Sequence, residues 1–91
     1  MIIRLSQHTT EKLSKELVRR GLTEELLKDA VTNPSELLYD TATGRYIALK
    51  TEQNLAVVYE KHGEDTLIIT AITSTKLEDM VQRRRRSGRW I

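Results

Sequence analysis

Pro34, the only proline of the chain, divides it into two segments whose apolar residues recur with different periods. Pro34 has no amide hydrogen and pushes Asn33 out of the α region, so a helix has to end there. Before it, apolar side chains recur every three to four residues, whereas from Glu36 onward they follow a period of two. The sequence therefore predicts an α+β domain whose first helices precede its sheet.

Two consecutive amphipathic helices are predicted before the proline. The first covers residues 9–20 and ends at Gly21, which accepts a left-handed backbone without strain. The second begins after the N-cap hydroxyl of Thr23 and stops near Asn33. Because the link between them is short, we expect an N-terminal helical hairpin.

Four strands are expected after the proline, at residues 36–40, 45–50, 54–60 and 66–73. Their short connections predict a four-stranded antiparallel meander. The last strand is apolar on both alternating faces, so we expect it to be central and covered on both sides. The hairpin would cover one face, and the chain ends or a partner protein the other. Residues 2–5 suggest an edge strand or a strap across the sheet.

A third helix is expected from about Lys76, because Thr75 and Glu78 have the spacing of a capping box. Its last turns contain four of the nine arginines of the chain. We therefore divide the protein into an α+β domain, residues 1–82, and an Arg-rich C-terminal extension of the last helix, residues 83–91.

The net charge of +2 is distributed unevenly. Residues 83–89 hold five arginines and no acid, while the rest of the chain carries 10 Lys and Arg against 13 Asp and Glu. This asymmetry is typical of an arm that binds a polyanion, although arginines also favour the C-terminal end of a helix dipole. Arg84 shares the apolar stripe of Leu77 and Val81, so we expect it to pack against the sheet. The predicted phosphate contacts are the other arginines: Arg83, Arg85, Arg86 and Arg89.

Several classes of protein are disfavoured by composition. Without cysteine there are no disulfides or thiolate metal sites, which fits a reducing cytoplasm. His8 and His62 are too far apart in sequence to suggest a metal-ligand motif. No window approaches the roughly 18 apolar residues of a membrane span. We expect a cytoplasmic protein with no metal, cofactor or membrane association.

Short motifs spread over nearly the whole chain form a recognisable pattern: His8-x-x-Glu11-Lys12-Leu13, Arg20-Gly21-Leu22-Thr23-Glu24-Glu25, Asn33-Pro34, Gly44-Arg45, Leu55-Ala56-Val57-Val58-Tyr59 and Leu67-Ile68-Ile69-Thr70. This pattern resembles a family of uncharacterised small domains related to the RelE/BrnT-type toxin superfamily. Better-known members of that superfamily are metal-independent ribonucleases with a helical hairpin on an antiparallel sheet. The resemblance implies a toxin-like fold, RNA as the substrate and an antitoxin protein as a partner.

Metal-independent RNA cleavage requires a base, an acid and cations that stabilise the phosphorane. His8 titrates near neutrality and fits the base or acid, with local capping of the first helix as its alternative. Lys12, one turn later, would add a cation to the same helix face, where the resembling domains often carry Arg. Arg45 follows Gly44, as in those domains, and would hold phosphate bidentately, with an exposed cross-strand charge pair as its alternative.

Lys76 is a further candidate phosphate contact, because helix N-termini favour anions. Ordinary capping by Ser74 or Thr75 explains this segment equally well. The three tyrosines, Tyr39, Tyr46 and Tyr59, are suited either to stacking on bases or to packing within the sheet.

The leading hypothesis is an RNA-binding toxin-like domain, with metal-independent endoribonuclease activity as its enzymatic version. The competing hypothesis is a non-catalytic module of the same fold that binds protein or nucleic acid. A homodimer is considered with it, because a small monomer has difficulty covering both faces of an apolar sheet.

Overall fold

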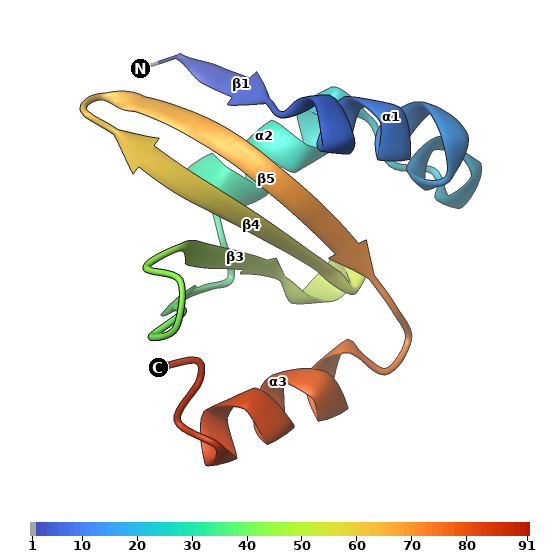
Figure 1. The fold of residues 1–91 in the computed structure, drawn as a ribbon. Helices are drawn as coiled ribbons and strands as arrows, with labels where there is room; N and C mark the ends of the chain where they lie inside the picture. Colours follow the sequence, from blue (N-terminus) through green and yellow to red (C-terminus); the bar gives the residue numbers. More distant parts are fainter. Residues whose placement is uncertain (1) are drawn as a thin grey trace.

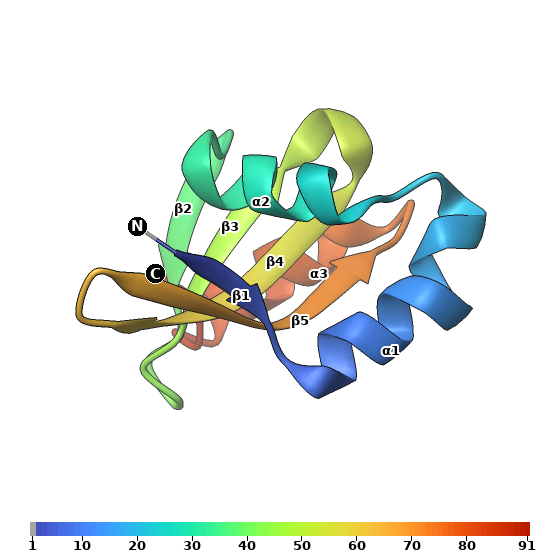
Figure 2. The same cartoon turned by 90° about the horizontal axis from the view of Figure 1, so that it is seen from above.

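The computed structural model describes residues 2–91, which form a five-stranded sheet with helices on both of its faces (Figures 1 and 2). In chain order the elements are β1 (Ile3–Leu5), α1 (Gln7–Lys15), the 3-10 turn η1 (Leu17–Arg20), α2 (Glu24–Thr32), β2 (Glu36–Tyr39), β3 (Tyr46–Lys50), the 3-10 turn η2 (Thr51–Gln53), β4 (Leu55–His62), β5 (Asp65–Thr73) and α3 (Leu77–Arg86). The strand order across the sheet is β1-β5-β4-β3-β2.

The prediction of a four-stranded antiparallel meander is wrong. Strands β2 to β5 do pair antiparallel with their neighbours, but β1 joins the sheet as a fifth strand, parallel to β5. Its register places Ile3 opposite Thr66 and Leu5 opposite Ile68. The sheet is therefore mixed. A three-residue strand carries too little periodicity to reveal its pairing, and two helices and three strands separate it from its partner β5 in the sequence.

The two N-terminal helices pack on the same face of the sheet, but they contact different strands and do not form a hairpin with each other. Helix α1 lies beside β1 and β5, whereas α2 lies across β3 and β4 (Figure 2). The predicted helix over residues 9–20 is interrupted at Glu16, whose backbone is not helical. This break lets Leu17, only 1% exposed, turn from the sheet edge into the core. Gly21, with φ of 80°, ends η1 in the left-handed conformation.

Local signals locate α2 correctly. The side chain of Thr23 accepts a hydrogen bond from the amide of Leu26, and the helix ends with Asn33 as its C-cap. The capping box predicted for the third helix is wrong, because no side chain caps α3 at Lys76. Instead, the Oγ atom of Ser74 accepts the amide hydrogen of Lys76.

Two apolar clusters lie on opposite faces of the sheet. On one face, side chains of α1, η1 and α2 pack on alternate residues of the strands, such as Val57 and Ile68. On the other face, Leu77 and Val81 of α3 pack with Trp90. The second cover of the sheet is thus supplied by the C-terminal part of the chain itself.

The last residues of the chain return to the sheet and pair with the outer edge of β2. Tyr39 and Ile91 exchange amide–carbonyl hydrogen bonds of 2.9 and 3.0 Å, and the amide of Thr41 donates to the carbonyl of Arg89 at 2.8 Å. Between these pairs, Asp40 and Trp90 form an antiparallel bridge. Residues 89–91 thus act as a short edge strand that holds the Arg-rich segment against the domain.

Candidate nucleic-acid interface

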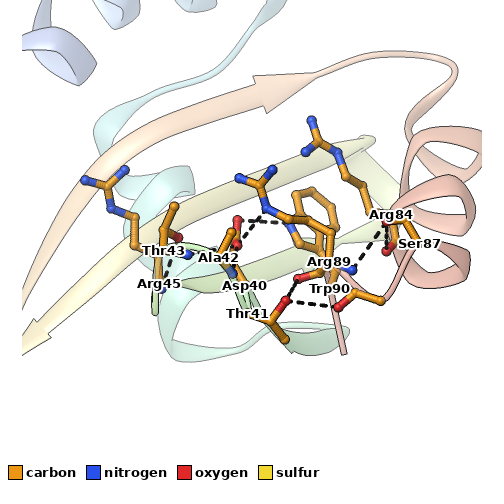
Figure 3. Close-up of polar contacts among 10 residues, drawn as sticks. Asp40, Thr41, Ala42, Thr43, Arg45, Arg84, Ser87, Arg89 and Trp90 are labelled. Carbon is orange, nitrogen blue, oxygen red and sulfur yellow. Dashed lines mark hydrogen bonds and ion pairs between the residues drawn. The ribbon is translucent and has the colours of Figure 1, made fainter.

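Three arginines from separate parts of the chain form a row near the C-terminal segment that pairs with β2 (Figure 3). Arg45 directly precedes β3, Arg84 belongs to α3, and Arg89 lies in the returning C-terminal segment. Figure 3 shows their three guanidinium groups extending to the same side. We call this set the arginine row.

Each guanidinium of the row is held by one partner. The Nε of Arg45 donates to Glu60 at 2.8 Å, and the Nε of Arg89 donates to Asp40 at 2.8 Å. Arg84 lies over the ring of Trp90, 5.4 Å from its centroid. The terminal nitrogens of Arg45 and Arg89 make no hydrogen bond to any residue within 2–91. Both arginines therefore keep donors for a ligand while their orientation is already set.

Asp40 holds Arg89, the member of the row that lies in the returning C-terminal segment. Its Oδ1 accepts hydrogen bonds from Arg89 and from the amides of Ala42 at 2.9 Å and Thr43 at 3.2 Å. Its Oδ2 accepts the indole N–H of Trp90 at 3.4 Å. The hydrogen bond from Arg89 is the main reason that the pKa of Asp40 falls to about 2, so this buried carboxylate is charged at neutral pH.

The turn after Asp40 brings Arg45 into the row. Asp40 caps the amides of this turn in the manner of an Asx turn, and Gly44 closes it with a φ of 76°. A side chain at Gly44 would be strained by that conformation. Sequence reasoning did not select Asp40 as a functional residue. The Asp-Thr-Ala-Thr-Gly segment marks a turn but does not reveal its partners.

A second group of cations lies on the outer face of α3. Lys76, Arg83 and Arg86 line one shallow hollow together with Asp79 and Gln82. These residues follow one another at helical spacing, so their side chains share a face of the helix. We call this surface the α3 basic face. Arg85 points elsewhere, into an ion pair with Glu36 at the start of β2.

The three residues predicted to act in catalysis are not assembled into one site. His8 is exposed, and its Nε2 lies 3.4 Å from the Oγ1 of Thr70 on β5. Lys12 is partly buried, and its ammonium group donates to the carbonyl of Ala71. Arg45 precedes β3, two strands away from β5, which corresponds to about 10 Å of strand spacing.

His8 and Arg45 nevertheless lie toward the same face of the sheet. Thr70 pairs with Val58, and Glu60 follows two residues later on the same face of β4. His8 contacts Thr70, and Arg45 contacts Glu60. The hydrogen bond from Arg45 is also the main cause that lowers the pKa of Glu60. A ligand that spans two strands would reach both residues.

Lys12 belongs to a set of side chains that cap the free edge of β5. Strand β1 pairs with β5 only as far as Ile68, so the carbonyls beyond it have no strand partner on that side. Side chains of the N-terminal helical region replace that strand. The donors and accepting carbonyls are Ser6 to Ile69 at 3.0 Å, Thr9 to Ile68 at 3.1 Å, Lys12 to Ala71, and Arg20 to Thr73 at 3.0 Å.

The tyrosines pack on one another across three neighbouring strands. The ring centroids of Tyr39 and Tyr46, and those of Tyr46 and Tyr59, are 5.5 Å apart. Tyr59 is buried, and burial raises the pKa of its hydroxyl. These rings lie on the face of the sheet opposite the arginine row, because Tyr46 alternates with Arg45. Their geometry is that of a packed ladder.

Within residues 2–91, no group of His, Cys, Asp and Glu side chains is arranged to hold a metal ion. None of the helices in this range is long and apolar enough to cross a membrane. Comparison with protein-family models, with curated proteins and with solved structures found no match to this chain.

Proposed function

We propose that this protein binds RNA through phosphate contacts made by the arginine row and the α3 basic face. The observation that carries the proposal is the arrangement of the row. Arg45, Arg84 and Arg89 come from distant parts of the chain, yet each is oriented by its own partner and all extend to one side (Figure 3).

The row is suited to phosphate recognition because its guanidinium groups are oriented before a ligand binds. A guanidinium held through its Nε keeps its terminal nitrogens for a phosphate oxygen, and little side-chain entropy remains to be lost. Arg83 of the α3 basic face and Arg84 of the row are neighbours in α3, about 100° apart around the helix. A flexible backbone that passes around α3 would contact both surfaces.

The choice of RNA as the polyanion follows from the toxin-like sequence pattern. RNA binding would place the protein in the cytoplasm. An antitoxin partner stays a prediction of the same resemblance. A homodimer also stays a prediction, but it is not needed to cover the second face of the sheet, because α3 and Trp90 cover that face.

Fluorescence anisotropy with a labelled oligouridylate tests the binding proposal. The Arg45→Met/Arg84→Met and Arg83→Met/Arg86→Met variants are each expected to weaken binding at least about tenfold. The slope of log affinity against log salt should fall by roughly 0.7 for each phosphate that no longer has an arginine partner. Lys61→Met is the matched control, because Lys61 is an exposed cation on the other face of β4. Unchanged affinity and slope in both double variants would overturn the proposal.

Metal-independent RNA cleavage is a second candidate function, favoured by the common orientation of His8 and Arg45 toward one face. Mixed RNA incubated with the protein in EDTA is expected to be cut, and the His8→Ala/Arg45→Ala variant to be inactive. An inactive wild-type protein, or equal cleavage by the variant, rejects the enzyme and leaves the binding proposal intact.

A further inference from the structure

A cavity of about 360 Å³ lies between α3 and the adjacent end of the sheet. Its apolar lining comes from Leu49 on β3 and from Leu77 and Val81 on α3. A volume of this size falls in the range of small-molecule sites, and an apolar lining suits the flat face of an aromatic ring. The cavity is separate from the arginine row, none of whose members lines it.

The polar lining of the cavity combines acceptors with a strong donor. Two carboxylates, Glu36 and Glu78, and the guanidinium of Arg85 surround the apolar surface. Arg85 and Glu36 form an ion pair through one nitrogen and one oxygen. Their remaining polar atoms make no hydrogen bond with any residue in the described range, so they are left for a ligand.

The cavity adjoins the α3 basic face. Gln82 lines both the cavity and the hollow that contains Lys76, Arg83 and Arg86. A molecule with a planar ring in the cavity would therefore have a phosphate within reach of these cations. This combination of a ring and a phosphate is that of a nucleotide.

We propose that the cavity binds the guanine base of a nucleotide, with its phosphate on the α3 basic face. This inference rests on the proposed RNA binding and names the base that is recognised. Guanine presents two adjacent N–H donors, at N1 and N2, to a carboxylate such as that of Glu36 or Glu78. Its O6 and N7 atoms accept hydrogen bonds from an arginine such as Arg85.

The other bases fit this lining less well. Adenine turns an acceptor nitrogen toward a carboxylate beside its single amino group. Uracil has one N–H donor between two carbonyl oxygens, and cytosine offers only its amino group. A site lined by two carboxylates leaves unpaired charges against these bases, which is the situation that discriminates most strongly.

Guanosine carries no phosphate, so a titration with guanosine tests the cavity alone. Binding is monitored by the backbone amide signals in NMR spectra. Guanosine is expected to shift the signals of Leu49, Leu77 and Val81 in a saturable manner, whereas uridine is not. The Glu36→Gln and Glu78→Gln variants should each bind guanosine about tenfold more weakly. Glu64→Gln, in the exposed β4–β5 turn, is the matched control.

A Thr51→Trp variant tests the site by filling it without changing any charge. Thr51 is exposed and lines the cavity, so the larger side chain is expected to abolish guanosine binding while the fold persists. Guanosine binding that is unaffected by both the carboxylate variants and Thr51→Trp would overturn the assignment. Equal shifts with guanosine and uridine would overturn it as well.

RNA oligomers separate failure of this inference from failure of the proposed function. An oligouridylate with one central guanine is expected to bind about tenfold more tightly than oligouridylate alone, and Glu78→Gln should remove that preference. Binding of both RNAs with equal affinity rejects the guanine site and supports RNA binding. Binding of guanosine by a protein that binds neither RNA supports the cavity and rejects the RNA proposal.

Discussion

The two edges of the sheet are closed by different means and use their cations differently. At the β5 edge, side chains from the N-terminal helical region donate to carbonyls that have no strand partner. The ammonium of Lys12 is one of these donors. At the β2 edge, the backbone of residues 89–91 forms a short strand. There the cations Arg84 and Arg89 are oriented by Trp90 and Asp40 and still extend outward.

This difference shows that a cation near a sheet edge has two distinct uses. A side chain that donates to main-chain carbonyls seals the edge against further strands. A side chain clamped by a carboxylate or an aromatic ring presents its remaining donors to a ligand. Both kinds of residue are basic and semi-exposed, so only their partners distinguish them.

The largest effect is expected at the β2 edge from Asp40→Ala. The change removes the acceptor of Arg89, of the indole of Trp90 and of two turn amides. We expect a loss of about 3 kcal/mol in the free energy of unfolding, measured with urea. RNA affinity should fall as well, because Arg89 loses its orientation.

Glu60→Gln is the control for this experiment, since Glu60 orients Arg45 but does not hold the C-terminal segment. It should change the free energy of unfolding much less. Equal losses from both substitutions would contradict the view that Asp40 organises this edge.

Low pH should destabilise the β2 edge. The pKa of Asp40 is lowered from 3.8 to about 2, so its stabilising effect is complete above about pH 4 and is lost as the pH falls through 2. The contribution amounts to roughly 2 kcal/mol. Urea unfolding at several pH values should show this loss in the wild-type protein, in excess of any loss in Asp40→Asn.

Other carboxylates with lowered pKa values, such as Asp29 and Glu60, lose their contribution in both proteins. Only the difference between the two curves is therefore assigned to Asp40. Parallel curves between pH 4 and pH 2 would contradict the assignment.

A smaller effect on stability is expected at the β5 edge from Lys12→Met. Methionine keeps the apolar stem but removes the donor to Ala71, at a cost of about 1 kcal/mol in the free energy of unfolding. RNA affinity should not change.

The smallest effect on stability is expected from Arg45→Met in the opposite edge region. The ion pair of Arg45 with Glu60 is about one third exposed, so its loss should change the free energy of unfolding by no more than about 0.5 kcal/mol. The same substitution should weaken RNA binding. A reversed pattern would remove the distinction between the two edges.

Local signals in the sequence were sufficient for much of the fold. Gly21, Thr23 and Asn33 mark helix boundaries because each acts on backbone groups within a few residues. The strands after the proline also follow from alternation. The parallel pairing of β1 escaped prediction, because Ile3 meets Thr66 across most of the chain and nothing local encodes that contact.

The sequence was sufficient to name cations of the candidate site, but not to predict which side chains orient them. Arg45 and Arg89 were named from the sequence, whereas the carboxylates that orient them were not. Asp40 lies 49 positions from Arg89. Lys12 resembled a catalytic cation because helical spacing places it beside His8, but its donor is directed to β5. The partner of each cation depends on how distant segments pack together, which the local sequence does not encode.

The returning C-terminal strand also has a consequence for the order of events during synthesis. The arginine row joins Arg45, near the middle of the chain, to Arg84 and Arg89 near its last residues. Strands β2 to β5 are available for pairing before those residues leave the ribosome. Because a domain of this size folds as a unit, we expect competence for polyanion binding to appear only after Trp90 has left the ribosome and paired with Asp40.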